Sequence, residues 1–316
     1  MATPADLGQP GSTAHAPSYY AASGLPQPER PPLQGRTQAD VCVIGAGYTG
    51  LSEALHLAEA GYKVVVLESA RVGWGASGRN GGQLVHSYSR DGDVIEARHG
   101  RDTAKALGDM AFEGARIIRA RIGQYRIDCD FKPGGMFAAL HDGQVRQLEH
   151  HASLWRRLGH QELTMLDARE SEAAIGSRRY VATLLDRSTG HVHPLKLAQG
   201  EAAAFESLGG VIHEFSRVTH IDHRDPAVVH TEQGQVQARF VIVACNAYIG
   251  DLEPKLAAKS MPCGTQVVAT EPLGDRFPEI LPSDHCVEDC NFLLDYFRLS
   301  ADRRLLYRSE EHTSEL

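Results

Sequence analysis

A glycine-rich turn constrains the fold of this 316-residue chain more than any other stretch. The apolar run VCVI at positions 41–44 precedes the turn and is typical of a buried parallel strand. Gly45 permits a sharp turn, Gly47 lets a pyrophosphate approach the backbone, and Gly50 lets the next helix lie close to the sheet. This spacing between a strand and a helix predicts a Rossmann-like α/β domain that binds a dinucleotide.

The residues after the turn indicate a ribose site. An apolar stripe runs along the helix, Gly61 is suited to its C′ position, and KVVVL at positions 63–67 predicts a second buried strand. Glu68 follows directly, 18 residues after Gly50. A carboxylate there can accept hydrogen bonds from both ribose hydroxyls and would repel a 2′-phosphate.

The stretch from Arg71 to Gln83 indicates which dinucleotide binds. It carries five glycines between Gly73 and Gly82, enough for backbone amides to crowd against a large flat ligand and its diphosphate. A nicotinamide dinucleotide would not require this second glycine-rich stretch. The two motifs together predict FAD.

Both motifs resemble those of the FAD-dependent D-amino acid oxidase/glycine oxidase superfamily, and the similarity runs from about Ser18 to Tyr307. Segments such as QLVHSYSRD, CNAYIGDLEP and CVEDCNFLLDYFRLSADRRLLY are similar to those of members that act in putrescine breakdown. The resemblance implies oxidation of a primary amine, gamma-glutamylputrescine, to gamma-glutamyl-aminobutyraldehyde with ammonia and hydrogen peroxide. Molecular oxygen is then the electron acceptor. Two alternatives stay open: an FAD-dependent oxidase or dehydrogenase of a secondary amine or amino acid (glycine or sarcosine type), and an inactive truncated flavoprotein fragment.

The resemblance also implies a discontinuous FAD-binding domain of the GR2 type with an inserted α+β substrate domain built on an antiparallel sheet. The last nine residues of the chain resemble the translation of a sequencing adapter, so we expect a C-terminal truncation. The expected parts are a flexible tail (1–37), the FAD-binding domain without its last piece (38–125 and 190–260), the substrate domain (126–189 and 261–307) and an adapter-derived artefact (308–316).

The candidate cofactor contacts come from the glycine turn, the stretch that begins at Glu68, the second glycine loop and three positions that the resemblance adds. They are Gly45, Ala46, Gly47, Tyr48, Thr49, Gly50, Glu68, Ser69, Arg71, Ala76, Ser77, Asn80, Gly81, Gly82, Gln83, Val218, Ala244 and Asn246. The resemblance implies that the backbone of Val218 contacts the adenine and that residues 244–246 pass near the cofactor.

Candidate substrate contacts lie in a predicted strand at residues 292–299. Strict alternation places Tyr296 and Arg298 on one face of it, where a phenol and a guanidinium could fix a carboxylate such as that of a glutamyl group. The alternative is an edge strand with one structural salt bridge, which Asp295 and Asp302 favour. The sequence names no catalytic residue.

Composition narrows the class of protein further. Lys and Arg number 32 against 40 Asp and Glu, and this net charge of −8 argues against a nucleic-acid partner. The six cysteines lack a CxxC pair, so we expect buried free thiols, although Cys286 and Cys290 could pair or bind a metal. We expect no metal site, because His191 and His193, taken as loop residues, lack a third ligand at usable spacing. Without a basic leader or a long apolar segment, we expect a cytoplasmic protein with no membrane partner.

Overall fold

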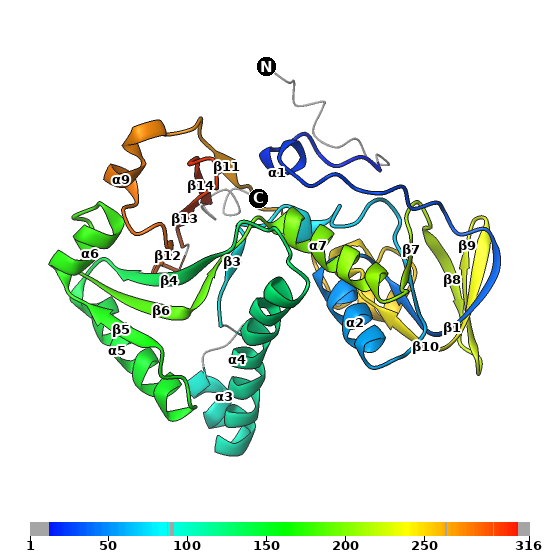
Figure 1. Cartoon of the computed structure of the whole chain (residues 1–316). Helices are drawn as coiled ribbons and strands as arrows, with labels where there is room; N and C mark the ends of the chain where they lie inside the picture. The colour runs from blue at the N-terminus through cyan, green and yellow to red at the C-terminus, as the bar shows by residue number, and fades with distance from the viewer. Residues whose placement is uncertain (1–12, 87, 89–91, 263, 293, 309–316) are drawn as a thin grey trace. The chain divides into compact units, whose positions relative to one another are not determined.

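The computed structural model describes all residues except 1–12, 87, 89–91, 263, 293 and 309–316 (Figure 1). The chain divides into two compact units. The first contains the residues up to Asn80, Ile127–Cys129 and the stretch that begins at Pro194; the second contains Gly81–Arg126, Asp130–His193 and the stretch that begins at Gly264. Most of the segment predicted to derive from an adapter lies outside the described residues, as does the start of the predicted tail.

The first unit is built on a six-stranded sheet with the order β7-β2-β1-β10-β9-β8. Its strands are β1 (Gly35–Ile44), β2 (Val64–Leu67), β7 (Val211–His213), β8 (Val218–Asp222), β9 (Ala227–Thr231) and β10 (Gly234–Val243). Strands β7, β2, β1 and β10 run parallel, whereas β10, β9 and β8 are antiparallel. Helices α2 (Tyr48–Glu59) and α7 (Pro194–Ser207) pack together beside this sheet (Figure 1). The predicted mixed α/β architecture with its buried parallel strands is confirmed.

Helix α2 ends where the sequence predicts. Gly61 adopts a φ of 85°, a left-handed conformation that favours glycine. Its N–H donates to the carbonyl of Ala58, and the N–H of Tyr62 donates to the carbonyl of Leu57. These two bonds form a Schellman motif, which satisfies carbonyl groups that the helix itself leaves unpaired.

The second unit is built on an eight-stranded sheet, β11-β14-β13-β12-β4-β6-β3, with β5 paired to β6. Its strands are β3 (Gln83–Leu84), β4 (Lys132–Ala139), β5 (Leu163–Leu166), β6 (Ala182–His191), β11 (Val268–Ala269), β12 (Cys286–Asp289), β13 (Tyr296–Leu299) and β14 (Leu305–Arg308). The pairing is antiparallel, as the resemblance implies, except between β12 and β4, which run parallel.

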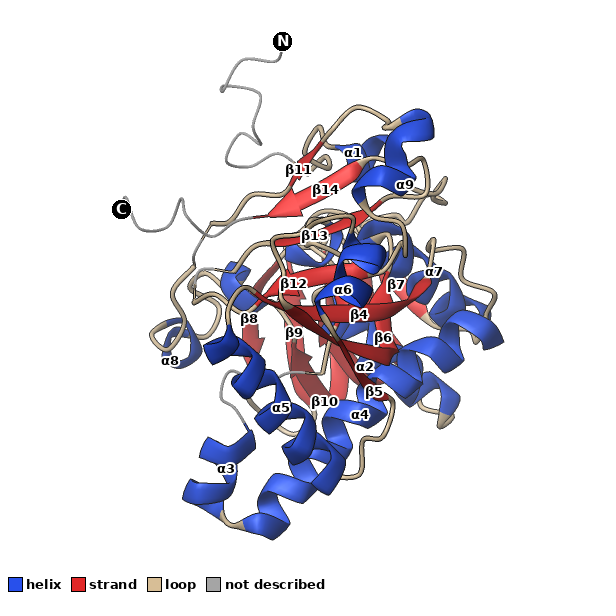
Figure 2. Ribbon diagram, turned by 90° about the vertical axis from the view of Figure 1, so that its left-hand side faces the viewer, coloured by secondary structure: helices blue, strands red, loops and turns tan. Residues whose placement is uncertain are grey.

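Alternation along β4 shows how helices cover this sheet on both faces. Met136 and Ala138 pack in a cluster with Ile175 of α6, whereas Ala139 packs with Trp155 of α5. Successive side chains of a strand point to opposite faces, so α5 and α6 cover opposite faces (Figure 2). The remaining helices and short helical turns are α1 (Tyr19–Ala22), η2 (Ala76–Gly78), α3 (Gly92–His99), α4 (Arg101–Gln124), α5 (Asp142–Arg157), α6 (Ala168–Ile175), η3 (Asn246–Tyr248), α8 (Pro254–Ala257), η4 (Gly274–Arg276) and α9 (Phe277–Ile280).

The units differ from the expected domain boundaries at α4. We expected the FAD-binding domain to continue to residue 125, but residues 81–125, with β3, α3 and α4, belong to the second unit. Gly108 of α4 lies against Leu158, which follows α5, and this glycine leaves no side chain to keep the two apart. Ile127 belongs instead to the first unit, where it packs against Gly200 of α7.

The strand predicted over residues 292–299 is wrong in extent. Strand β13 begins only at Tyr296, and Phe292 is 96% exposed. Of the two histidines expected in a loop, His191 instead ends β6, whereas His193 lies in the loop between β6 and α7; each is only 2% exposed.

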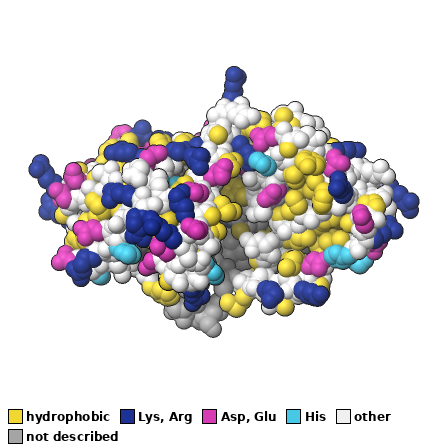
Figure 3. All heavy atoms as spheres, turned by 90° about the horizontal axis from the view of Figure 1, so that it is seen from below, with side chains coloured by type: hydrophobic (Ala, Val, Ile, Leu, Met, Phe, Trp, Pro, Cys, Tyr) yellow, Lys and Arg dark blue, Asp and Glu magenta, His cyan; other side chains and the backbone are white. Residues whose placement is uncertain are grey.

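The described surface carries charges of both signs. On the face shown in Figure 3, Lys and Arg side chains lie among Asp and Glu. No helix in the described part of the chain is long and apolar enough to span a bilayer.

Candidate functional site

A cavity of about 920 Å³ opens in the first unit at the carboxyl ends of its parallel strands. Ile44 at the end of β1, Leu67 at the end of β2 and Ala244 just after β10 all line it. Ligands of open α/β sheets bind at this edge of the strands. The cavity therefore lies where the glycine motif predicts a dinucleotide.

The glycines of the turn leave space that no other residue would leave. Gly45 adopts a φ of 108°, and a Cβ there would lie 2.7 Å from the carbonyl oxygen of Ala244. A Cβ on Gly50 would overlap the carbonyl oxygen of Gly45, and one on Gly47 would lie 2.8 Å from Oγ of Ser77. Since Gly45 and Gly47 line the cavity, its floor is bare backbone at the start of α2, as a diphosphate requires.

Glu68 is held in place by backbone donors. Its Oε2 accepts from the N–H of Ala46 at 2.7 Å, and its Oε1 accepts from the N–H of Ala70 at 2.9 Å. A carboxylate offers about four acceptor positions, so two bonds of this kind fix its orientation and leave capacity for further donors. Glu68 also lines the cavity, at the end of β2 where a ribose would lie.

The second glycine loop packs directly onto the first turn. Oγ of Ser77 accepts from the N–H of Tyr48 at 2.9 Å, and the N–H of Gly73 donates to the carbonyl of Ala46 at 3.0 Å. The two motifs, which are separate in sequence, form one wall. The exposed backbone of the glycine turn, the carboxylate of Glu68 and the second glycine loop together fit the adenosine diphosphate half of FAD.

Half of the predicted cofactor contacts meet in this cavity. Those that line it are Gly45, Gly47, Glu68, Ser69, Ala76, Ser77, Val218, Ala244 and Asn246. Those of the first unit that lie outside its lining are Ala46, Tyr48, Thr49, Gly50, Arg71 and Asn80, whereas Gly81, Gly82 and Gln83 belong to the second unit.

Two of the residues outside the lining make contacts within the first unit. The hydroxyl of Tyr48 donates to the carbonyl of Pro194, which ties α2 to the start of α7, and burial raises the pKa of this phenol. Arg71 lies 3.6 Å from the carboxylate of Glu214 and stacks over Phe215. Arg71 thus contacts Phe215, which lines the cavity.

Cys245 also lines the cavity; it lies within the stretch 244–246 that we expected near the cofactor, although it was not named as a contact. Burial raises the pKa of its thiol to about 11, and the nearby charge of Glu68 acts in the same direction. Its position between Ala244 and Asn246, both predicted contacts, is the sequence feature that indicates a place in the cavity wall. The five described cysteines are free thiols, as expected, but only Cys42, Cys129 and Cys286 are buried, whereas Cys245 and Cys290 are half-buried; Cys263 lies outside the described residues.

In the second unit, Tyr296 and Arg298 both contact the end of the second glycine loop. A Cβ on Gly81 would overlap the ring of Tyr296, so the ring lies against bare backbone. Arg298 is 2% exposed; its Nε donates to the carbonyl of Gly81 at 2.5 Å, and its Nη1 donates to that of Leu299. Its guanidinium therefore holds the glycine segment. Asp302 of the suggested salt bridge pairs with Arg304.

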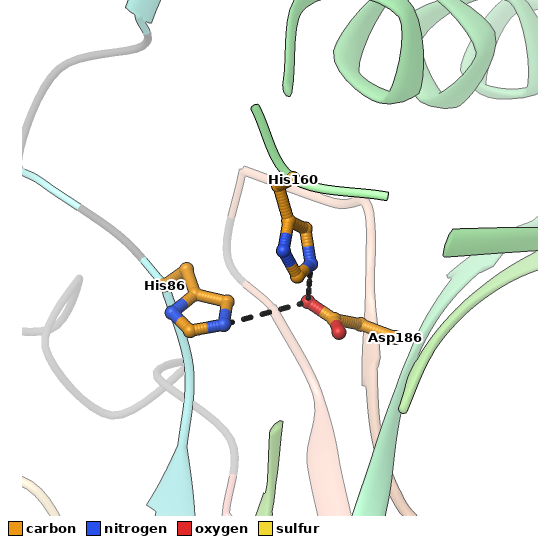
Figure 4. Close-up of side chains that lie close together, drawn as sticks. All are labelled: His86, His160 and Asp186. Carbon is orange, nitrogen blue, oxygen red and sulfur yellow. Dashed lines mark hydrogen bonds and ion pairs between the residues drawn. The ribbon is translucent and has the colours of Figure 1, made fainter. Parts of the chain in front are cut away.

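The second unit also contains a buried cluster of His86, His160 and Asp186, whose ligand-type atoms lie within 4.8 Å of one another (Figure 4). Oδ1 of Asp186 accepts from both the N–H and the hydroxyl of Ser188, and Oδ2 accepts from Nε2 of His160 at 3.0 Å. Burial raises the pKa of Asp186, but the hydrogen bonds from His160 and Ser188 outweigh it and hold that pKa below its usual range. Protein donors thus already satisfy this carboxylate, although the cluster has the residue types of a metal site.

A profile of the FAD dependent oxidoreductase family matches residues 40–315. The chain belongs to this family. Over 93% of its length and 70% of the relative, it is 57% identical to the gamma-glutamylputrescine oxidoreductase of Escherichia coli. It is 41% identical to the probable oxidoreductase OrdL of Haemophilus influenzae, over 94% of this chain and 70% of that one.

Solved structures of similar fold include glycine oxidase from Geobacillus kaustophilus, with a TM-score of 0.64 and 21% identity over 86% of this chain and 71% of that one. L-proline dehydrogenase from P. horikoshii has a TM-score of 0.68 and 17% identity, over 87% of this chain and 70% of that one. This member of the FAD dependent oxidoreductase family is thus an oxidoreductase, and FAD is its cofactor.

Proposed function

We propose that this protein oxidises the primary amine of gamma-glutamylputrescine, with molecular oxygen as acceptor, in cytoplasmic putrescine catabolism. One amine, one oxygen and one water give gamma-glutamyl-aminobutyraldehyde, ammonia and hydrogen peroxide. The choice of substrate is supported by the 57% identity to gamma-glutamylputrescine oxidoreductase over 93% of the chain. The glycine oxidase of Bacillus licheniformis is more distant, at 26% identity over 79% of this chain.

The first unit would bind FAD and the second would bind the amine. In the first unit, the backbone of Gly47 and the start of α2 would hold the diphosphate, Glu68 the ribose hydroxyls, and Val218 the adenine. FAD bound there supplies an acceptor for two electrons. The chain's own residues supply the binding and orientation: Ser77 and Glu68 fix the first turn, and Arg298 fixes the backbone of Gly81.

The purified protein, loaded with FAD, tests this proposal in a peroxide assay. We expect gamma-glutamylputrescine to release hydrogen peroxide and aldehyde in equal amounts, while glycine and sarcosine release little. Turnover of glycine or sarcosine but not of gamma-glutamylputrescine would refute the substrate. A comparison of oxygen with an artificial electron acceptor distinguishes an oxidase from a dehydrogenase. A yellow protein with bound flavin that oxidises none of these amines would match the alternative of an inactive fragment.

A further inference from the structure

Glu288 of β12 lies on a strand face that the proposed function leaves unexplained. It is directly opposite Tyr296 of β13 on one side and Phe137 of β4 on the other. Residues paired in this way project from the same face of a sheet. Glu288 and Tyr296 are therefore neighbours on the face where Tyr296 meets the bare backbone of Gly81.

The segment after Gly81 also reaches this face. Nε2 of Gln83 donates to the carbonyl of Val287 at 3.2 Å, next to Glu288. Gln83, Phe137 and Glu288 line one small cavity, together with Cys286. An acidic side chain, an aromatic ring and the end of the second glycine loop thus share one recess in the second unit.

The carboxylate of Glu288 has no hydrogen-bond or ion-pair partner within the described residues. Burial raises the pKa of Glu288 to about 7, and the neighbouring charge of Asp289 adds to the effect. A partly buried carboxylate without a cation is costly to a fold, so its charge calls for a complement from outside the chain.

Neighbouring charged groups do not supply that complement. Asp289 is itself acidic, and Cys286 has its pKa raised to about 12 by burial, with Glu288 adding to the effect. Arg298, two residues along β13 from Tyr296, donates to the carbonyls of Gly81 and Leu299. Arg308 of β14 stacks over the ring of Tyr296.

We propose that Glu288 binds the terminal ammonium of the amine substrate. This inference rests on the proposed function and specifies how the second unit would recognise its substrate class. A primary ammonium brings one positive charge and three N–H donors, which a lone carboxylate lacks. Glycine and sarcosine carry a carboxylate next to their amine, which Glu288 would repel. The residue therefore favours amines whose nearest negative group lies far from the nitrogen.

Calorimetry on the FAD-loaded enzyme, reduced beforehand with dithionite under nitrogen so that no turnover occurs, tests the proposal. The probes are gamma-glutamylputrescine, n-butylammonium and the neutral n-butanol. Glu288→Gln should weaken binding of both amines about tenfold or more, because the variant removes one partner of a desolvated charge pair. Binding of n-butanol should not change.

Two further variants make the result specific to the charge at this position. Glu162→Gln removes an exposed carboxylate of the same unit and should leave all affinities unchanged. Glu288→Asp keeps the charge and should retain part of the amine affinity. Wild-type affinity for the amines should fall as pH drops below about 7, where Glu288 becomes protonated, and this dependence should vanish in Glu288→Gln.

The two hypotheses fail in different ways. Equal amine affinity in the wild type and in Glu288→Gln, with the same pH dependence, overturns the role of Glu288 and leaves the proposed function standing. Loss of n-butylammonium binding in Glu288→Gln, with no binding of gamma-glutamylputrescine by the wild type, supports the charge contact and overturns the proposed substrate. Failure of the wild type to bind either amine overturns both. Melting temperatures measured at pH 8 check that the variants fold.

Discussion

Gly50→Ala is the substitution that most directly tests the packing of the glycine turn. In an ordinary exposed helix this change stabilises by about 1 kcal/mol, because alanine loses less backbone entropy than glycine. Here the added Cβ would overlap the carbonyl oxygen of Gly45 and lie 3.1 Å from Cγ1 of Val43. The obstacle is mainly backbone, so the helix itself must move away from β1.

The structure sets the size of the expected effect. Forcing an extra methyl group into a packed site costs about 1–3 kcal/mol, which exceeds the gain of about 1 kcal/mol in helix propensity. We therefore expect Gly50→Ala to lower the free energy of unfolding by up to about 2 kcal/mol. It should also weaken FAD binding, because shifting α2 moves the backbone of Gly45 and Gly47 that lines the cavity.

Gly114→Ala is the matched control. Gly114 lies inside α4, and a Cβ there would meet no atom within 4 Å. This variant should gain up to about 1 kcal/mol and bind FAD normally. Urea denaturation followed by circular dichroism gives the stabilities, and equilibrium dialysis gives the dissociation constant of FAD. If Gly50→Ala matched Gly114→Ala in both measurements, the close approach of α2 to β1 would be refuted.

Three further predictions follow from buried carboxylates. Glu68→Gln should weaken FAD binding about tenfold in the same dialysis assay. A neutral amide accepts hydrogen bonds from ribose hydroxyls more weakly, and its single oxygen cannot replace both carboxylate oxygens that accept from backbone N–H groups. Unchanged affinity would exclude Glu68 as the residue that binds the ribose. Asp186→Asn should cost about 3 kcal/mol of stability at pH 7, since it breaks a buried network. The native pKa of Asp186 is lowered, so its contribution to stability should be present above its ordinary pKa of 3.8 and be lost as pH falls through the native pKa. Denaturation curves from pH 7 to pH 3 in which the variant and the wild type keep the same difference in stability would contradict this. Glu288 is the opposite case: its pKa rises from 4.5 to about 7, so the folded state should lose up to about 3 kcal/mol as pH rises through this interval, and Glu288→Gln should remove that loss in the same titration.

The parts of the fold that sequence predicted are those whose determinants are close together along the chain. The run at positions 41–44 forms one strand, Gly45 supplies the positive φ of the turn, and Gly50 and Gly61 act on residues a few positions away. Their conformations follow from local sterics, and the carboxyl ends of β1 and β2 meet wherever a parallel pair forms. The floor of the cavity and Glu68 were therefore predictable.

The buried histidine cluster was not predictable in this way. His86 follows β3, His160 precedes β5, and Asp186 lies on β6, so pairing of β3 and β5 with β6 brings them together. Nothing in the spacing of these three residues reveals that register. The same reason explains the shift of α4 to the second unit, because its packing depends on residues some fifty positions later.

The acidic pair Glu288 and Asp289 shows how one local feature could have predicted which residue shares a strand face with Tyr296. Asp289 accepts from the N–H groups of Asn291 and Asp295, and its own N–H donates to the carbonyl of Asp295. These bonds close the turn that leads into β13, which is why Phe292 is exposed and the strand begins at Tyr296. Because Asp289 pins the turn, Tyr296 must lie opposite Glu288. One carboxylate thus has its acceptor sites filled in setting the register, and the other projects onto the sheet face with its charge unmatched. An Asp followed two residues later by Asn is a turn signal that a strict alternation pattern overlooks.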